Sequence, residues 1–419
     1  MGEALNGLKR NIMCGDARES HIGQKVTVMG WVQRNRNLGG LQFIDLRDRE
    51  GILQVVFNDD LGEEILEKAK SIRPEYCIAV TGEIVKRESV NPNMPTGMVE
   101  LMCEEIKVLS ESETPPIYIK EGLDASEQIR LKYRYLDLRR PDMQNIFMIR
   151  NRATKAVRDF LDNNGFLDVE TPMLTKSTPE GARDYLVPSR NYPGMFYALP
   201  QSPQIFKQLL MVSGFDRYYQ IVKCFRDEDL RANRQPEFTQ IDMELSFVEQ
   251  DDVMALNEGL IKHVFKEVLG VEVKTPIKRM TFKDAMEKYG SDKPDLRFGM
   301  EITNLSDVVK ECGFKVFTDA VANGGSVRGL CLEGGASMGR KDIDRLGEFV
   351  KTFKAKGLAW IQLKEEGVKS PIAKFFSEEE LNKIIETMGA KTGDLILIVA
   401  DKNSVVLKAL GELRLELSR

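Results

Sequence analysis

The sequence predicts a multidomain α+β protein, and three observations carry this expectation. Its 419 residues are enough for roughly three domains of about 150 residues each. Short runs rich in Val, Ile and Phe, separated by Gly, Asn and Pro, fill residues 25–109 and indicate strands. A helical pattern and two long strands follow, and strand and helix signals alternate from about residue 300 onward.

The composition excludes several classes of protein. The net charge is −5, the mean hydropathy is −0.30 and no apolar run approaches 18 residues, so we expect a cytoplasmic protein with no membrane partner and no secretory signal. The six cysteines lie far apart without a Cys-x-x-Cys pair, which favours free thiols over a disulfide framework or a zinc site. Only His21 and His263 are present, so we expect the chemistry to depend on Arg, Lys and carboxylates.

The first block has the element pattern of an OB-fold. Strands are predicted over residues 25–34, 40–47, 51–57, 76–87 and 99–109, with a helix over 61–71 between the third and fourth. This pattern matches the partly open barrel that binds oligonucleotides on the face of strands 2 and 3. Two cations, an aromatic ring and an amide fall on the first three strands: Arg34, Arg36, Phe43 and Gln54. They suit single-stranded bases, although a surface arginine pair and a core phenylalanine explain them equally well.

Two features mark the junction with the second block. Residues 110–123 contain two prolines and are predicted to form a linker. Residues 130–158 carry nine Lys or Arg against two Asp. Charge runs are usually solvated faces, but this excess suits a polyanion that crosses both domains.

The second block contains a predicted polar pocket. A helix from residue 145 to 163 is followed by a strand over 166–173, and a second helix is expected with Ser202 as N-cap and Pro203 at its first position, ending at 213–214. Strands over 215–226 and 237–248 are joined by a polar loop. One face of the later strand carries a ring, an amide and two acids: Phe238, Gln240, Asp242 and Glu244. We interpret this face as the floor of a pocket within reach of Arg226 and Glu228.

The third block is predicted to be an α/β or α+β unit. Helices are expected over residues 342–356 and 378–388, strands over 358–363 and 395–400, and a final helix with Val406, Leu410, Leu413 and Leu417 on one side. The Gly-rich segment 334–340 misses the phosphate-loop pattern, because Arg340 stands where that pattern requires Lys. We interpret it as a turn.

In the second block the sequence resembles the class II aminoacyl-tRNA synthetases. Residues 165–172 (GFLDVETP) resemble motif 1 of that class, and residues 225–242 resemble motif 2 with its loop. Segments 178–185 (TPEGARDY) and 201–208 (QSPQIFKQ) are similar to the bacterial-type aspartyl-tRNA synthetases. The resemblance implies an N-terminal OB-fold β-barrel, a class II antiparallel-sheet catalytic domain and a C-terminal α/β insertion domain.

The resemblance also implies domain boundaries. We expect an anticodon-binding domain at 1–109, a hinge at 110–140, the first part of the catalytic domain at 141–299, a GAD-like insertion domain at 300–410, and the start of a return to the catalytic domain at 411–419. Motif 1 builds a dimer interface in this class, so a homodimer with Pro172 at its interface is implied.

The family further implies the activation of L-aspartate with ATP and Mg²⁺, and its transfer to the 3′ end of tRNA(Asp). Arg226 is the implied catalytic residue. The implied aspartate-binding residues are Glu180, Gln204, Lys207, Arg226 and Asp242. The implied ATP-binding residues are Arg226, Asp227, Glu228, Gln235, Phe238 and Gln240. Because the attacking carboxylate is already ionised, this reaction needs no general base, which agrees with the shortage of histidine.

The barrel residues match positions that read anticodon bases in the family: Arg34, Arg36, Phe43, Gln54, Asn91 and Asn93. Charging of tRNA(Asn) in addition is left open. In the family this depends on loops around Leu38 and Pro92. Some relaxed members carry a His at the first of these two positions, so Leu38 favours strict specificity.

One family element is not found in this sequence. Motif 3, a Gly-rich strand and helix with a second ATP-binding arginine, should follow the insertion block. We therefore expect a C-terminally truncated chain with an incomplete catalytic domain, in which no metal ligand is assigned from the sequence and activation by this chain is in question. Lysyl- and asparaginyl-tRNA synthetases are alternatives that residues 201–208 disfavour, and a non-catalytic RNA-binding paralogue is an alternative of another class.

Overall fold

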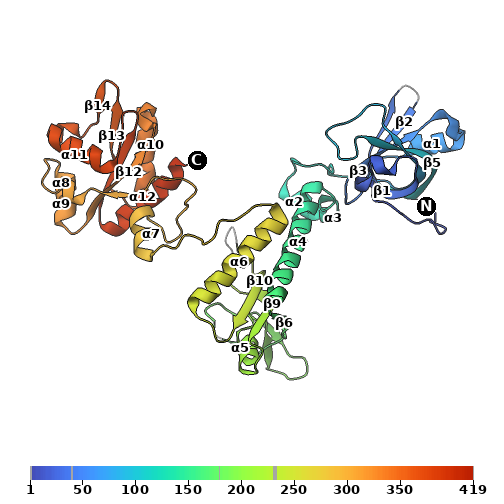
Figure 1. Cartoon of the computed structure of the whole chain (residues 1–419), viewed down its shortest axis with the longest axis horizontal. Coiled ribbons are helices and arrows are strands. Elements are labelled where there is room, and N and C mark those ends of the chain that lie inside the picture. Colours follow the sequence, from blue (N-terminus) through green and yellow to red (C-terminus); the bar gives the residue numbers. More distant parts are fainter. Residues whose placement is uncertain (1, 39–40, 179, 230–233, 419) are drawn as a thin grey trace. The chain divides into compact units, whose positions relative to one another are not determined.

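The computed structural model describes all residues except 1, 39–40, 179, 230–233 and 419, and it divides into two compact units, Met1–Pro276 and Ile277–Arg419. The first unit contains a barrel and a helix-and-sheet part, and the second contains a sheet with helices (Figure 1). Among the described residues, no helix is long and apolar enough to cross a membrane.

Five strands close the N-terminal barrel in the order β1-β2-β3-β5-β4. Their bounds are β1 Lys25–Leu38, β2 Leu41–Arg47, β3 Ile52–Phe57, β4 Cys77–Lys86 and β5 Val99–Ser110, with α1 Glu63–Ser71 between β3 and β4. Alternating apolar side chains such as Val28, Ile44 and Val55 are fully buried inside. The five predicted strands and the helix are present, although β1 continues past its predicted end at residue 34.

A β-bulge in β1 decides which of its residues face outward. Val32 lies in the apolar core, and regular alternation would send the next even-numbered residues of β1 inward as well. The pairing with β2 shifts between Val32 and Arg34, and beyond the shift Asn35 lies opposite the buried Ile44. Because the bulge inserts one residue, the alternation reverses, and Arg34 and Arg36 are directed to the outside of the barrel.

The rest of the first unit is a small sheet with helices packed on it. The sheet order is β10-β9-β6, with β10 antiparallel and β6 parallel to β9. The elements are α4 Pro141–Asn163, β6 Leu167–Asp168, β7 Leu186–Pro188, β8 Phe196–Ala198, α5 Gln204–Val212, β9 Arg217–Phe225, β10 Glu237–Leu245 and α6 Gln250–Leu269. Val157 and Leu161 of α4 meet Tyr219 of β9 and Leu260 of α6 in the core.

Two local predictions for this part are wrong. The strand expected over residues 166–173 is only two residues long, β6, and Pro172 further along has no N–H with which to continue a ladder. Helix α5 begins at Gln204, with Pro203 in the capping position and not inside the helix. Ser202 does not cap α5, because its hydroxyl donates a hydrogen bond to Glu180 instead.

The second unit is a three-layer α+β domain. Its sheet order is β11-β12-β15-β13-β14 with every pair antiparallel, so the α/β expectation is corrected to α+β. Leu395, Leu397 and Val399 of β15 pack with α10 and α12, and Ile396 and Ile398 pack in a second core on the other face. The elements are α7 Phe282–Tyr289, β11 Thr303–Asn304, α8 Ser306–Val309, α9 Lys315–Ala322, β12 Ser326–Leu332, α10 Arg340–Lys351, β13 Ala359–Lys364, β14 Gly367–Lys369, α11 Glu378–Met388, β15 Leu395–Asp401 and α12 Asn403–Leu417.

The boundaries of this unit differ from those predicted. It begins at Ile277 and not at residue 300. Met286 of α7 packs against the core that contains α12, and the buried Arg414 of α12 donates hydrogen bonds to the backbone carbonyls of Asp295, Phe298 and Gly299, so these segments belong to the second unit. Residues 411–418, expected to start a return to the catalytic domain, belong to α12 and the residue that follows it, and Leu413 is fully buried in this unit's core.

Local differences are smaller. Helix α10 ends at Lys351 and not at residue 356, and Lys354 takes a left-handed backbone conformation with φ of 72°. The Gly-rich segment 334–340 forms a turn, as predicted: Gly334 has a φ of 70°, and its N–H donates to Asp394.

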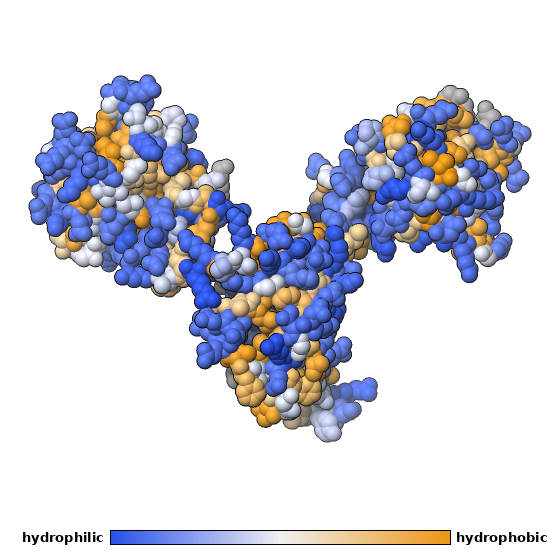
Figure 2. All heavy atoms as spheres, viewed as in Figure 1, coloured by the Kyte–Doolittle hydropathy of each residue, from blue (hydrophilic) through white to orange (hydrophobic). Residues whose placement is uncertain are grey.

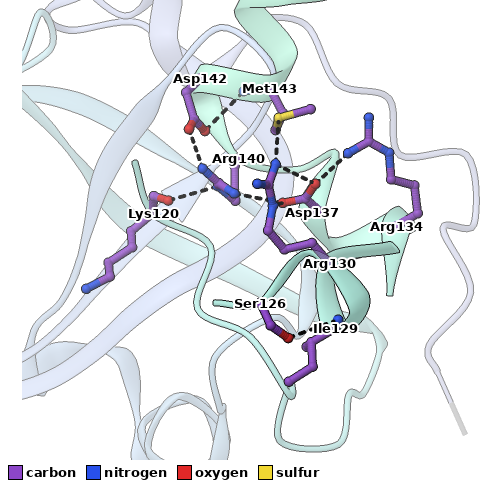
Figure 3. A network of polar contacts seen from close by, with 9 residues as sticks. All are labelled: Lys120, Ser126, Ile129, Arg130, Arg134, Asp137, Arg140, Asp142 and Met143. Atoms are coloured by element: carbon purple, nitrogen blue, oxygen red, sulfur yellow. Dashed lines mark hydrogen bonds and ion pairs between the residues drawn. The ribbon is translucent and has the colours of Figure 1, made fainter. Parts of the chain in front are cut away.

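The basic run at residues 130–158 is largely neutralised inside the first unit. Asp137 is fully buried at the end of α3 Arg134–Asp137, which follows α2 Glu127–Lys132. It accepts hydrogen bonds from Arg130 Nε at 3.1 Å, Arg134 Nη1 at 2.5 Å and Arg140 Nη1 at 2.8 Å, as Figure 3 shows. Several arginines of the run therefore pair with carboxylates and do not form a free surface for a polyanion.

Glu75 gathers two further arginines. Arg47 donates to both of its carboxylate oxygens at 2.9 Å, and Arg139 donates at 2.8 Å. The Arg139 guanidinium also lies 4.8 Å from the centre of the Trp31 ring, a cation–π contact.

We predict that Asp137→Asn lowers the free energy of unfolding of this region by about 1.5–3 kcal/mol at pH 7, because the buried Arg140 loses one of its two carboxylate partners and the partly exposed Arg130 and Arg134 lose their anion. Burial raises the pKa of Asp137, but the hydrogen bonds and charges of Arg130 and Arg140 outweigh burial and hold that pKa below 3.8. Its stabilising contribution is therefore present above about pH 4 and is lost as the pH falls through the lowered value.

Urea denaturation combined with hydrogen exchange of amides 130–143, between pH 3 and 7, measures this effect. Glu67→Gln is the matched control, since Glu67 pairs with Lys70 on the barrel surface and its loss changes stability by less than about 1 kcal/mol. Equal stability of Asp137→Asn and wild type at pH 7 would contradict the assignment.

Candidate functional site

An ion pair occupies the polar face of β10. Lys207 Nζ of α5 lies 2.9 Å from Asp242 Oδ1 and 3.4 Å from Glu244 Oε2. Asp242 is buried and Lys207 is mostly buried, so both charges are shielded from solvent. The predicted face is thus polar, and the helix that covers it supplies the complementary cation.

Two buried polar atoms at this sheet lack a hydrogen-bond partner among the described residues. They are Asp242 Oδ2 and Arg226 Nε. Buried polar atoms are nearly always hydrogen-bonded, so an unpaired acceptor and an unpaired donor indicate places where a ligand can bind.

A second group lies around the end of β9. Arg226, Glu228, Gln235 and Phe238 line one cavity of about 310 Å³, together with Asp229, Arg234 and Pro236. The Arg226 guanidinium carbon lies 5.2 Å from the centre of the Phe238 ring. The backbone N–H of Arg226 donates a hydrogen bond to the backbone carbonyl of Pro236 at 2.8 Å. Residues 230–233 of the polar loop fall outside the described residues.

Two predicted ATP-site residues do not line this cavity. The backbone N–H of Asp227 donates to the Arg183 carbonyl at 3.0 Å and joins the strand end to the preceding loop. Gln240 Oε1 accepts a hydrogen bond from the thiol of Cys224 at 3.2 Å. Burial, with the negative charge of Asp242 adding to it, raises the pKa of Cys224 to about 11, so the thiol keeps the proton that it donates.

The loop that carries Glu180 is held by residues that the sequence did not single out. Gln201 Nε2 donates to the Ala182 carbonyl at 2.9 Å and to Asp184 Oδ1 at 2.6 Å. Glu180 accepts from the Ser202 hydroxyl at 3.0 Å, and both line a cavity of about 160 Å³. Pro179, part of the quoted 178–185 segment, lies outside the described residues. Gln201 stands in the quoted 201–208 segment, so its amide was the available signal.

The remaining predicted residues of this part are exposed. Gln204 is the first residue of α5, and its side chain faces solvent one turn before Lys207. Pro172 is exposed after β6. The two histidines lie elsewhere: His21 Nδ1 accepts from the Arg18 N–H, and the His263 ring lies 5.6 Å from that of Phe160.

On the barrel, β1, β2 and β3 bring four predicted residues onto one outer face. Arg36 lies opposite Phe43, and Arg34 and Gln54 both lie opposite Asp45, so the residues form two adjacent rows across the strands. Arg34 is exposed, and Arg36 forms an ion pair with Asp45 at 2.6 Å. Cations beside a half-buried aromatic ring, here Phe43, are suited to single-stranded bases.

Sequence reasoning missed two residues of this face. Gln54 is buried because Arg87 donates to its Oε1 at 2.5 Å and because its Nε2 donates to Glu100 at 2.7 Å. Burial raises the pKa of Glu100, against the lowering effect of that hydrogen bond and of Arg87. Nothing in the strand pattern marks Arg87 and Glu100, because only barrel closure brings β5 with Glu100 beside β3 and brings Arg87, just after β4, within reach of Gln54.

The loop with Asn91 and Asn93 is compact. The Asn91 N–H donates to the Gly97 carbonyl at 3.0 Å, and Asn91 Oδ1 accepts from the Asn93 N–H at 3.1 Å. The Thr96 hydroxyl donates to the Ile52 carbonyl at 2.6 Å, which fixes this loop to the start of β3. The loop therefore borders the same outer face.

Among the described residues, no group of three or more His, Cys, Asp or Glu side chains is arranged to hold a metal ion. All six cysteines are free thiols.

Comparison with protein families gives two matches. Residues 126–398 match the family described as tRNA synthetases class II (D, K and N), and residues 26–109 match the OB-fold nucleic acid binding domain. Together these matches cover the barrel, the later part of the hinge from residue 126, the candidate pocket and most of the second unit.

Relatives match over the whole chain. The chain is 94% identical to the aspartate--tRNA ligase of Clostridium perfringens and 78% identical to that of Clostridium botulinum, over all 419 residues and 70% of the length of each relative. Among solved structures, asparaginyl-tRNA synthetase from Pyrococcus horikoshii, complexed with asparaginyl-adenylate, has a TM-score of 0.56 at 20% identity, over 98% of this chain and 96% of that one. This last similarity supports the fold alone. The chain belongs to the class II tRNA synthetases of the D, K and N group, and it is an aminoacyl-tRNA ligase.

Proposed function

We propose that the amino acid of this ligase is L-aspartate: ATP activates it to aspartyl-adenylate, which is then transferred to the 3′ end of tRNA(Asp). The observation that carries the proposal is the Lys207–Asp242 pair beside the Arg226–Phe238 stack. A buried cation and a buried anion complement an amino acid that carries a side-chain carboxylate and an ammonium group. The names of the relatives support the same substrate.

Each side chain of the pocket has a part in this reaction. The ammonium of aspartate replaces Lys207 as the partner of Asp242, and Lys207 turns to the side-chain carboxylate. Two further residues complete the amino acid site: Gln204 at the start of α5, and Glu180, whose carboxylate accepts a hydrogen bond from the Ser202 hydroxyl. Phe238 stacks on adenine, with Glu228 and Gln235 at the rim of the same cavity.

In the chemical step the ionised α-carboxylate of aspartate attacks the α-phosphorus of ATP, and pyrophosphate leaves with the bonding electrons. No proton has to move, so no general base is required. Arg226 neutralises the charge that builds on the α-phosphoryl oxygens, which is the main contribution available from this chain's own residues. Asp227 joins the end of β9 to the loop of Arg183, and Gln240 of β10 accepts a hydrogen bond from Cys224 of β9. Both contacts hold the strands in place around the site.

The cofactor set that we propose is ATP with Mg²⁺. Glu228 and Asp229 line the nucleotide cavity, and two carboxylates plus phosphate oxygens fit the usual coordination of this ion. When bound, Mg²⁺ would neutralise phosphate charge.

We propose that the outer face of β1, β2 and β3 binds the anticodon of tRNA(Asp) through Arg34, Arg36, Phe43 and Gln54, bordered by Asn91 and Asn93. The match to a nucleic acid binding domain supports this. Leu38 and Pro92, both exposed, lie where discrimination against tRNA(Asn) would be made, and aminoacylation of each transcript separates strict from relaxed charging.

We also propose a homodimer and a cytoplasmic location. Exposed apolar side chains gather on the central part, where α5 and β6 to β8 lie, as Figure 2 shows in orange. Among them are Leu167, Leu174, Phe196, Leu209 and Val212, more than an isolated surface ordinarily exposes, so a partner surface close to Pro172 is expected. The free thiols fit a reducing compartment.

The deciding experiment is ATP–pyrophosphate exchange with aspartate, run on this chain and on protein extended to the length of its relatives. The proposal predicts aspartate-dependent exchange by the extended protein, and its absence would contradict the function. A further proposal, that exchange requires the family's motif 3 as well, would be overturned by full exchange from this chain. The non-catalytic RNA-binding alternative, which the relatives' names do not favour, predicts RNA binding without ATP binding.

We predict that Arg226→Ala in the extended protein reduces exchange about 10²–10³-fold, the usual cost of removing one donor to developing charge. Binding of tRNA should remain unchanged. Arg190→Ala is the matched control, because Arg190 is an exposed arginine in the β7–β8 connection. Exchange retained in Arg226→Ala would remove Arg226 from the site.

We predict that Lys207→Gln raises the KM for aspartate about 10- to 100-fold, since a charge-assisted hydrogen bond of roughly 1.5–3 kcal/mol is lost. The KM for ATP should move much less. Exchange measured over a range of each substrate separates the two constants, and equal increases in both would indicate a structural role for Lys207.

We predict that Arg34→Ala weakens tRNA binding about 10-fold and lowers the slope of log K against log salt by about 0.7–0.9. Filter binding between 50 and 200 mM salt measures both. Arg49→Ala, at an exposed arginine that pairs with Glu50, is the control. Unchanged affinity and slope in Arg34→Ala would argue against this face.

A further inference from the structure

A cavity on the first unit lies beside the proposed anticodon face, and apart from Arg34 and Arg36 its lining residues have no part in the proposed function. Its volume is about 690 Å³, within the range of roughly 300–1,000 Å³ that holds small ligands. It is formed by the end of β1, the segment before β4 and the linker 112–120. Its polar lining includes Arg34, Arg73, Tyr118 and Lys120.

The linker presents alternate side chains to this cavity. Ile117 and Ile119 are buried with Leu136 in a small apolar core, whereas Tyr118 and Lys120 between and after them are exposed. Gln33 Nε2 of β1 donates to the Ile119 carbonyl at 2.8 Å, so the linker is fixed beside the barrel. Tyr118 is 77% exposed, which leaves a large aromatic surface available at a fixed position.

The charge of the cavity is positive. In the part of the chain that the structure describes, no carboxylate lies within 4 Å of the charged groups of Arg34, Arg73 or Lys120. Glu75, which also lines the cavity, is already neutralised by Arg47 and Arg139. Glu113 is the one other acid in the lining, so the cations outnumber the available negative charge and an anionic ligand is favoured.

This cavity is continuous with the proposed base-binding rows, because Arg34 and Arg36 contribute to both. A strand of RNA with a base on Phe43 would pass directly beside it. Unpaired cations and an exposed aromatic ring are what single-stranded nucleic acid requires.

We propose that this groove binds one further single-stranded nucleotide of the bound RNA, outside the three anticodon positions. Its phosphate lies on Arg73 and Lys120, and its base stacks on Tyr118. The inference rests on the proposed RNA-binding function of the barrel and adds a second aromatic stacking position to that of Phe43.

Filter binding of an anticodon stem-loop RNA to the full chain tests the proposal, with Tyr118→Ala, Tyr118→Phe and Arg73→Ala as variants. Tyr118→Ala should weaken binding about 10-fold, whereas Tyr118→Phe should bind like wild type, because stacking uses the ring and not the hydroxyl. Arg73→Ala should lower the salt slope by about 0.7–0.9. An abasic substitution at the contacted loop position should abolish the difference between wild type and Tyr118→Ala.

Failure of this inference can be distinguished from failure of the barrel function. If Arg34→Ala weakens binding while Tyr118→Ala and Arg73→Ala bind like wild type, the groove is not a nucleotide site and the barrel function stands. If the wild-type chain does not bind the RNA, both are overturned. Both side chains are exposed, so neither substitution is expected to disturb folding.

Discussion

The buried pairing of Lys207 with Asp242 is the interaction on which the proposed active site depends. Removing two charges from water costs more than their attraction usually returns, so an isolated buried ion pair is a poor way to stabilise a fold. Here the pair lies between α5 and β10, with one carboxylate oxygen of Asp242 and the Nε of Arg226 unpaired among the described residues. A ligand that carries both a positive and a negative group can give Lys207 and Asp242 each a new partner of opposite charge. The charges in the pocket then stay balanced when the ligand is bound. This is why the ion pair favours an amino acid as ligand over a simple anion.

Buried carboxylates also form ion pairs elsewhere in the first unit. Asp137 is surrounded by three arginines, and Glu75 by two. These carboxylates neutralise several arginines of the basic run, whereas Arg34, Arg73 and Lys120 around the barrel groove have no ion pair with any carboxylate that the structure describes. The cations available to RNA are therefore set less by the number of basic residues than by which of them the buried acids neutralise.

Patterns within one element were predictable from sequence, whereas features that depend on two distant elements were not. Alternation along β10 correctly separated the polar Asp242 and Glu244 from the apolar Met243 and Leu245, since one strand specifies its own two faces. The five barrel strands were equally visible. The bulge after Val32, which turns Arg34 and Arg36 outward, has no local signature, because it is defined by pairing with β2.

Long-range contacts explain the other differences. The inclusion of Asp295 and its neighbours in the second unit depends on Arg414, more than a hundred residues further along, and the antiparallel sheet depends on the strand order β11-β12-β15-β13-β14. The role of Gln201, which the quoted 201–208 segment contains, and the presence of Arg87 at the barrel face were missed because each acts through partners on other segments.

The measurement that tests the central claim most directly is calorimetric binding of unreactive adenylate analogues carrying aspartate, asparagine or lysine to this chain. The exchange of partners at Lys207 and Asp242 predicts that the aspartyl analogue binds at least about 10-fold more tightly than the other two, the effect of one charge-assisted hydrogen bond. Equal affinity for all three, or a preference for lysine, would contradict it.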